Sequence, residues 1–100
     1  MKQCLFTPAA ILDLDGIWDY TVDKWGPAQA ERYVRMIQDT VGGLEKGTQR
    51  SLSAEHIRAG YRGALVGMHV LFFKEASDTI QIVRILHQQM DLPAHLGDAE

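Results

Sequence analysis

Three apolar segments separated by short turns, in the C-terminal part of the chain, constrain the fold more than any other feature. They run from Arg58 to Leu65, from Met68 to Lys74 and from Thr79 to His87. Between them stand Val66-Gly67 and Ala76-Ser77-Asp78, which are typical of tight turns. Strands joined by turns this short pair as antiparallel neighbours. The region therefore predicts a three-stranded antiparallel meander.

Two helical patterns precede the meander, because apolar residues recur there at steps of three and four. In the first pattern these are Ile11, Leu14, Trp18, Val22 and Trp25, and in the second Ala30, Tyr33, Val34, Ile37, Val41 and Leu44. The first helix is predicted from Pro8 to Lys24, with Thr7 as its N-cap. Gly26-Pro27 ends it and starts the second helix, which fades at Gly42-Gly43. The short connection predicts an antiparallel helical hairpin, and the period places Trp18 and Tyr33 in the core.

The remaining segments complete the order of elements. Gln3 to Phe6 is a short strand candidate, and Glu45 to His56 is polar and without a period, as expected for a loop. We expect an α+β fold in which an N-terminal strand and a helical hairpin precede the meander (β-α-α-β-β-β), with the hairpin covering one face of a small, mostly antiparallel sheet. Residues 1–100 are expected to form a single domain, with residues 91–100 as a C-terminal tail.

Both faces of the predicted meander are apolar. In the last strand, alternation places Ile80, Ile82, Arg84 and Leu86 on one face and Thr79, Gln81, Val83, Ile85 and His87 on the other. A sheet with one face in water normally alternates apolar with polar residues, so something must cover each face. The helical hairpin can cover only one. The second face is covered either by the chain's own tail, Leu92 to Leu96, or by another polypeptide.

Composition restricts the function classes. The chain has 100 residues, of which 46% are hydrophobic, and a net charge of −3, so it has no basic surplus for gripping RNA. Arg58, Arg62 and Arg84 still allow a local positive patch. The acidic residues Asp15, Asp19 and Asp23 recur every four residues along the first helix, as a solvated face or as a patch that steers a partner.

Cellular location and bound groups are predicted from what the sequence lacks. No apolar run is long enough to span a bilayer and the first residues lack the apolar region of a secretion signal, so we expect a cytoplasmic protein without a membrane partner. The single cysteine, Cys4, is predicted to be a small apolar residue of the first strand. Without Cys/His spacing or a glycine-rich phosphate loop, we expect no metal and no cofactor.

One weak catalytic constellation is present. His69 and His87 are predicted to approach each other across adjacent strands, with Arg62 and Arg84 near them. Histidine and arginine groups are what acid–base cleavage of RNA would require. Histidines at the ends of strands also serve structure or recognition, and the pattern leaves both interpretations open.

Several stretches carry a resemblance to a known family. They are Ile17-Trp18-Asp19-Tyr20, Trp25-Gly26-Pro27, Gly60-Tyr61-Arg62, Val66 to Phe73 and Ile82 to Asp91. From about Leu5 to Asp91 the chain resembles the ParE toxins of bacterial toxin–antitoxin pairs, within the RelE/ParE superfamily. The resemblance implies a non-enzymatic toxin of a type II system that inhibits DNA gyrase. It also implies neutralisation by a ParD-like antitoxin in a hetero-oligomer, with operator DNA contacted only through the antitoxin.

The resemblance and the sheet pattern together suggest two sets of binding residues. For the antitoxin they are Trp25, Met36, Arg58, Tyr61, Arg62, His69 and Phe73. Among these, Arg58, Tyr61 and Phe73 are expected on the open sheet face and its edge. For the target they are Arg84, His87, Gln88 and Met90.

Two alternatives to a gyrase inhibitor remain. One is a RelE-like messenger RNA endoribonuclease that uses His69, Arg84 and His87. The other is an interaction module that keeps antitoxin binding without toxicity. The chain also departs from many relatives at Met68, where they have arginine, and in the loop at Gly47-Thr48-Gln49-Arg50, which bears on the choice of target more than on the fold.

Overall fold

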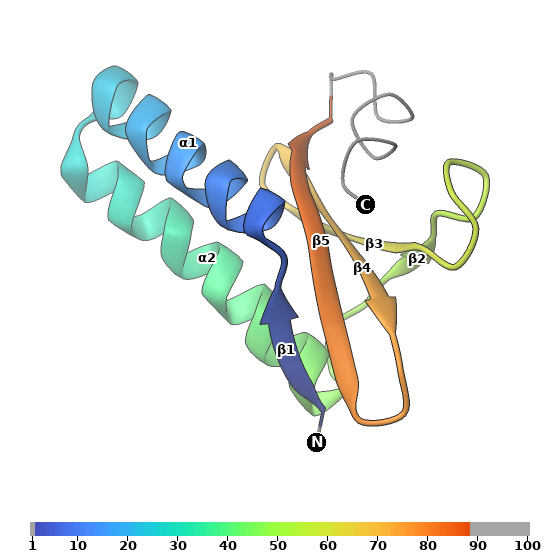
Figure 1. Ribbon diagram of the computed structural model, residues 1–100. Helices are drawn as coiled ribbons and strands as arrows, with labels where there is room; N and C mark the ends of the chain where they lie inside the picture. The colour runs from blue at the N-terminus through green and yellow to red at the C-terminus, as the bar shows by residue number, and fades with distance from the viewer. Residues whose placement is uncertain (1, 89–100) are drawn as a thin grey trace.

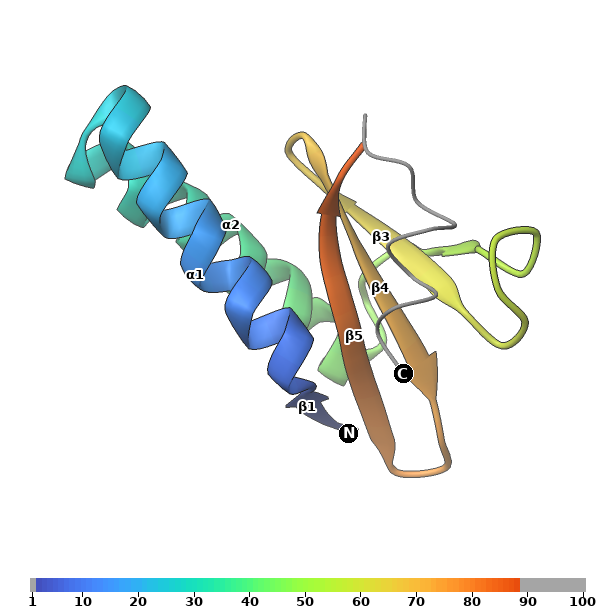
Figure 2. The same ribbon diagram turned by 45° about the horizontal axis from the view of Figure 1, so that its top comes forward.

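Two long helices lie against one face of a five-stranded sheet in the computed structural model, which describes residues 2–88 (Figure 1). The elements, in chain order, are β1 (Gln3–Phe6), α1 (Pro8–Trp25), α2 (Pro27–Lys46), β2 (Leu52–Ser53), β3 (Arg62–Val66), β4 (His69–Glu75) and β5 (Thr79–His87). Turning the molecule shows both helices on the same side of the sheet (Figure 2). The predicted α+β class and the order of strand, helical hairpin and meander are confirmed.

Helix α1 begins where the sequence predicts, because Thr7 caps it. The Ala10 amide donates to Thr7 Oγ1 at 3.1 Å, and Pro8 takes the first helical position, where its missing N–H costs nothing. Gly26, with φ of 91°, ends α1 and precedes α2 directly. Glycine adopts this φ without a steric penalty. The tight turn of the hairpin therefore depends on this one residue.

Helix α2 does not fade at Gly42-Gly43 as predicted, but continues to Lys46. A Cβ on Gly43 would lie 2.9 Å from the Cβ of Gln49, which belongs to the segment that folds back after the helix. Gly43 therefore serves close packing rather than helix termination. The period alone could not distinguish these two uses of a glycine.

The sheet has the order β1-β5-β4-β3-β2 and is mixed. Strand β1 pairs in parallel with β5, while the other neighbours are antiparallel. The two-residue strand β2 lies inside the segment predicted as a loop, and it pairs Leu52 with Gly63. The first strand of the meander begins at Arg62 rather than at Arg58, because the amides of Ile57 and Arg58 both donate to the Ala54 carbonyl at 3.0 Å in a turn.

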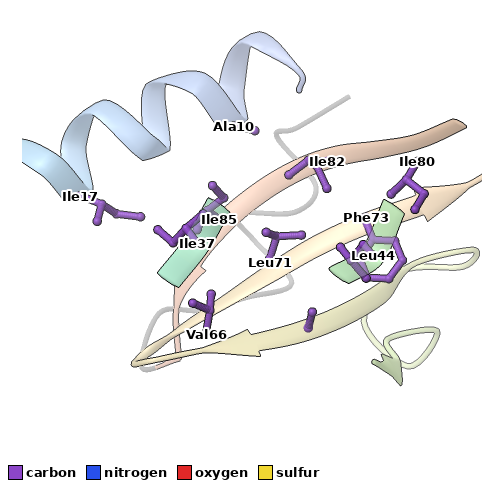
Figure 3. Packing of buried hydrophobic residues seen from close by; sticks show 11 residues of the cluster. Ala10, Ile17, Ile37, Leu44, Val66, Leu71, Phe73, Ile80, Ile82 and Ile85 are labelled. Atoms are coloured by element: carbon purple, nitrogen blue, oxygen red, sulfur yellow. The ribbon is translucent and has the colours of Figure 1, made fainter. Parts of the chain in front are cut away.

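A β-bulge corrects the predicted faces of β5. Phe73 lies opposite Ile82, but Phe72 lies opposite Arg84, so Val83 has no partner of its own in β4. The extra residue shifts the alternation by one position. Ile82 and Ile85 consequently point to the same side of the sheet, which strict alternation does not allow (Figure 3).

The two faces of the sheet are both apolar, as predicted, and each contributes to a buried cluster. The cluster beneath the helices contains Ala10, Ile17, Ile37, Leu44, Ala64, Val66, Leu71, Phe73, Ile80, Ile82 and Ile85 (Figure 3). The cluster on the other face contains Ala54, Tyr61, Phe72, Val83 and Leu86. The segment from Ala54 to Tyr61 supplies part of this second cover, and Leu92 to Leu96 lies outside the described residues. Neither helix within residues 2–88 has an apolar stretch long enough to cross a membrane.

Candidate partner-binding site

Strand β5 extends beyond β1, and side chains from the start of α1 take the place of a neighbouring strand there. Strand β1 ends at Phe6. The Thr7 hydroxyl donates to the Val83 carbonyl at 2.7 Å, and the Ile85 amide donates to Asp13 Oδ2 at 2.9 Å. Buried backbone groups need such partners, so these contacts hold α1 against β5.

Asp13 also binds Arg84 with both carboxylate oxygens. Arg84 Nε lies 2.7 Å from Oδ2 and Arg84 Nη2 lies 2.9 Å from Oδ1, which is the two-pronged geometry of strong arginine–carboxylate pairs. The two side chains are only 15% and 14% exposed. The charge of Arg84, which the sequence suggested for target binding, is therefore balanced beneath α1.

His69 and His87 face each other across β4 and β5, as predicted. They are register partners, and their ring centroids lie 5.3 Å apart in an edge-to-face arrangement. Tyr33 of α2 extends this row, because its hydroxyl lies 2.6 Å from His69 Nδ1. The same hydroxyl accepts the Met68 amide at 3.0 Å and lies 3.2 Å from the Val66 carbonyl. One hydroxyl thus joins the helical hairpin to the β3–β4 turn.

The environment favours the neutral form of His69. Burial lowers its pKa, the neighbouring His87 lowers it further, and Asp13 opposes both effects. Burial also raises the pKa of Tyr33, against the opposing hydrogen bond from the Met68 amide. A neutral imidazole can accept a hydrogen bond from the Tyr33 hydroxyl at Nδ1, which agrees with the short distance between the two atoms.

The β3–β4 turn is shaped to receive Tyr33. Gly67 has φ of 57°, and a Cβ at this position would lie 2.6 Å from the Tyr33 hydroxyl oxygen. At the other side of the turn, Gln88 Nε2 donates to the Gly67 carbonyl at 3.3 Å, and the Gln88 amide donates to the Met68 carbonyl at 3.0 Å. The turn is therefore anchored both to α2 and to the end of β5.

A groove of about 350 Å³ lies between α1 and the histidine pair. Its lining residues are Leu12, Asp13, Gly16, Ile17, Tyr20, Thr21, His69, Ile85 and His87. Leu12 and Tyr20 stand at its rim and are 71% and 62% exposed. An open apolar groove bordered by large exposed side chains is typical of a protein-binding surface.

More large apolar side chains are exposed along the hairpin. They are Ile11, Trp18, Trp25 and Met36. Trp25 and Met36 thus face solvent, as a partner-binding role requires. The prediction that Trp18 belongs to the core is wrong, since 39% of this residue is exposed. It lies beside the buried stripe of α1 rather than within it, whereas Tyr33 packs against the core as predicted.

Two residues predicted for the open sheet face are buried instead. Phe73 is 0% exposed and lies beneath the helices, because it shares a face of β4 with Leu71 and the helical hairpin covers that face. Tyr61 is 1% exposed and belongs to the cluster on the opposite face. Arg58 lies over the Tyr61 ring, with its guanidinium carbon 5.8 Å from the ring centroid. The prediction that Tyr61 and Phe73 lie on an open surface is therefore wrong.

The remaining predicted residues do not gather at one place. Arg62 donates to Ser51 Oγ at 2.9 Å and to the Ser51 carbonyl at 3.0 Å, and on β3 it lies at the opposite end from the register partner of His69. The predicted approach of Arg62 to the histidines is therefore wrong. Gln88 is exposed next to the histidine pair, and Met90 lies outside the described residues.

Cys4 lies in β1 and packs against the core, as predicted. Burial raises the pKa of its thiol to about 11, and the nearby Glu45 carboxylate adds to this effect. The thiol therefore stays protonated at neutral pH, when only a thiolate would be an effective nucleophile.

The sequence interpretation gave no place in the two binding sets to five residues of this region. Asp13 and Tyr33 position the site, and Leu12, Gly16 and Tyr20 line the groove. A signal was present for the groove, because Leu12, Gly16 and Tyr20 recur at four-residue steps on a side of α1 separate from the buried stripe. No local signal pairs Asp13 with Arg84, since 71 residues separate them.

Comparison with known proteins decides the family. A family model described as "ParE toxin of type II toxin-antitoxin system, parDE" matches residues 4–92. This chain belongs to the ParE toxin family. It is 40% identical over 96 residues to "Toxin ParE1" of Mycobacterium tuberculosis strain H37Rv, covering 95% of this chain and 98% of that protein.

Two further similarities agree with the ParE assignment. "Toxin ParE1" of Caulobacter vibrioides is 38% identical over 97 residues, covering 97% of this chain and all of that protein. A solved structure described as "Chromosomal ParDE TA system from P. aeruginosa" superposes with a TM-score of 0.75 at 27% identity, covering 87% of this chain and 96% of that one. Each match therefore covers nearly the full length of the relative.

Proposed function

We propose that this ParE-family chain is neutralised by direct binding of a ParD-like antitoxin and that its target is DNA gyrase. The observation that carries the proposal is the family match over residues 4–92. The similar solved structure is that of a ParDE system, which supports an antitoxin as the partner. Operator DNA would then be contacted only through the antitoxin.

Exposed apolar groups on the hairpin and the groove beside His69 support antitoxin binding. Trp25 and Met36 are 68% and 46% exposed, and large aromatic or apolar groups of this kind anchor protein interfaces. Arg58 packs over Tyr61 of the opposite-face cluster and Arg62 is hydrogen-bonded to Ser51, so both remain in the proposal as polar contacts away from the hairpin. Tyr61 and Phe73 no longer belong to it because both are buried.

The end of β5 is the proposed target-binding region. His87 borders the groove, and Gln88 is exposed beside the β3–β4 turn. Arg84 would act there by holding β5 in position through Asp13. Met90 stands two residues after Gln88 in the sequence and stays part of this proposal.

Two features favour a toxin without catalytic activity over a ribonuclease. The guanidinium of Arg84 is balanced by Asp13, so it offers little net charge to a phosphate. The described lining of the groove also contains no lysine or arginine, so it offers no permanent positive charge to a nucleic acid backbone. One observation favours the ribonuclease alternative. The ring centroids of His69 and His87 lie 5.3 Å apart and His69 is linked to Tyr33, an arrangement that resembles an acid–base pair.

Induction of the chain alone in a bacterial host tests the proposal. Covalent DNA–gyrase complexes and the 5′ ends of messenger RNA are measured in the same culture, with and without the paired antitoxin. Trapped gyrase with intact messages, relieved by the antitoxin, is the expected result. Cut messages with undisturbed DNA would reject the gyrase proposal in favour of the ribonuclease. Growth without arrest would reject both toxic activities in favour of an interaction module.

A matched pair of variants separates the two mechanisms. The double variant His69→Ala with His87→Ala removes both imidazoles of the groove, and His56→Ala removes an exposed imidazole of the loop before β3. A ribonuclease would lose message cleavage only in the double variant. A gyrase inhibitor would cut no messages in any form.

A further inference from the structure

Two histidines from different strands form a close pair at one end of the sheet. His69 begins β4, His87 ends β5, and they are direct register partners. The Gln88 amide donates to the Met68 carbonyl at 3.0 Å, so the neighbouring pair carries the hydrogen bonds and the histidines form a non-hydrogen-bonded pair. Side chains approach each other most closely at such pairs. Both histidines are partly exposed and line the groove beside α1, so solutes can reach them.

The separation of the two rings matches that of two ligands on one metal ion. The ring centroids lie 5.3 Å apart. Zinc binds an imidazole nitrogen at about 2.0–2.1 Å, and two imidazoles on one tetrahedral ion therefore have centroids about 5 Å apart. The paired strands already hold the rings at the separation that a shared ion requires.

Tyr33 prepares His69 for this role. Its hydroxyl lies 2.6 Å from His69 Nδ1, accepts the Met68 amide at 3.0 Å and lies 3.2 Å from the Val66 carbonyl. The hydroxyl can donate its hydrogen to Val66 while its oxygen accepts from Met68 and from the Nδ1–H of His69. This arrangement leaves the free lone pair of His69 on Nε2. Metal-ligating histidines commonly use a hydrogen bond of this kind at the other ring nitrogen to fix the tautomer.

The charges near the pair favour ions that bind to nitrogen. Burial and the neighbouring His87 lower the pKa of His69, which favours the neutral imidazole that metal ions require. Asp13 opposes this shift, but its carboxylate is already engaged in an ion pair. Beside the groove, Lys24 Nζ lies 5.6 Å from the centroid of the Tyr20 ring and adds positive charge. Affinity therefore depends on imidazole coordination, which favours Zn²⁺, Ni²⁺ or Cu²⁺ over the oxygen-binding ions Mg²⁺ and Ca²⁺.

We propose that His69 and His87 bind one divalent transition-metal ion between the ends of β4 and β5. Within residues 2–88 no third histidine, cysteine or carboxylate joins them in a metal-holding group, so water completes the coordination. Two protein ligands bind far more weakly than a structural four-ligand site, with a Kd on the order of 10 µM. The sequence predicted no metal because it lacks a Cys/His spacing, whereas strand pairing brings these two ligands together. The inference depends neither on the antitoxin nor on the target.

Titration with ZnCl₂ tests the site on the full chain, purified without a polyhistidine tag and dialysed against a chelator. Calorimetry should show one ion per chain. The melting temperature should rise by roughly 10 °C when free Zn²⁺ is about a hundredfold above the Kd, because the ion binds only the folded chain. Mg²⁺ at the same concentration should give no rise. A melting temperature that Zn²⁺ leaves unchanged would refute the site.

Four single variants locate the ligands. His69→Ala and His87→Ala should each abolish the Zn²⁺-dependent rise in melting temperature, and the exposed control His56→Ala should keep it. Tyr33→Phe keeps both imidazoles and removes only the hydroxyl, so it should weaken Zn²⁺ binding by about tenfold. Undiminished binding in His69→Ala or His87→Ala would overturn the inference, and undiminished binding in Tyr33→Phe would remove the positioning role of Tyr33.

Nuclear magnetic resonance on the unaltered chain keeps the test decisive if a variant does not fold. Substoichiometric Cu²⁺ should broaden the ring proton signals of His69 and His87 before those of His56, because a paramagnetic ion broadens the signals of its own ligands first. Equal broadening of all histidine signals would show binding at scattered exposed imidazoles and would refute the pair. One ion per two chains, with a dimer in sedimentation, would place a ligand on a second copy and overturn the single-chain site.

Discussion

Replacing Asp13 by asparagine should destabilise the fold strongly, although the side chain keeps its size. Asp13 accepts three hydrogen bonds, two from Arg84 and one from the Ile85 amide. Asparagine has one acceptor oxygen and a donor NH₂ group in place of the second oxygen. In Asp13→Asn the guanidinium would therefore face a donor and lose its counter-charge beneath α1.

The expected loss of stability in Asp13→Asn follows from the burial of the Asp13–Arg84 ion pair. Removing one partner of a fully buried ion pair costs about 3–5 kcal/mol. The Arg84 and Asp13 side chains keep 15% and 14% of their exposure, so solvent screens part of the charge. We therefore expect a loss of about 2–4 kcal/mol in the free energy of unfolding, or a fall of roughly 10–25 °C in melting temperature.

Urea unfolding followed by circular dichroism measures the effect, in a cycle with Arg84→Met. The single variant Arg84→Met should cost less, because Asp13 keeps the Ile85 amide as a partner. The combination of Asp13→Leu with Arg84→Met should recover only part of the stability, because apolar groups can replace a buried ion pair but leave the Ile85 amide without its acceptor. A coupling free energy below about 0.5 kcal/mol in the cycle Asp13→Asn with Arg84→Met would refute the reasoning.

Three further predictions follow from the turn, the histidine and the core. The folded-state pKa of His69 is lowered, so its contribution to stability is present above about pH 6.5 and is lost as the pH falls through the folded pKa. Between pH 7.5 and pH 5.5 the melting temperature should therefore fall less in His69→Gln than in the unaltered chain. Equal falls in the two proteins would contradict this. Gly67→Ala should cost about 2–4 kcal/mol in chemical unfolding, because of its φ and its clash with Tyr33, and Tyr33→Phe in the same chain should not restore it fully, since the backbone strain remains. Phe73→Ala should cost about 3–5 kcal/mol while the exposed control Leu65→Ala costs less than about 1 kcal/mol, and similar losses for both would show that Phe73 is not in the core.

The elements themselves could be predicted because their signals are local. The capping residue Thr7 and Pro8 mark the start of α1, and Gly26 marks the turn of the hairpin. Short turns between apolar segments specify the antiparallel meander and also the facing pair His69 and His87. Each of these signals involves residues close in sequence, or a register that a short turn determines.

Other parts of the site depend on contacts between distant segments. The bulge at Val83 shifts the alternation of β5, so that Ile82 and Ile85 share the face beneath the helices, a feature that a period of two cannot reveal. The two-residue strand β2 was missed because it is too short to show a period. Trp18 lies in an apolar helical pattern, yet the helix position relative to α2 leaves it partly in water.

By itself, the sequence determined the α+β class, the helical hairpin, the meander and the apolar character of both sheet faces. Only the tertiary structure decided the parallel pairing of β1 with β5, the burial of Tyr61 and Phe73, and the ion pair of Asp13 with Arg84. The physical reason is that helices and tight turns form from interactions within a few residues. Which buried groups meet across the fold depends on how whole elements pack, and many sequences with the same local pattern would pack differently.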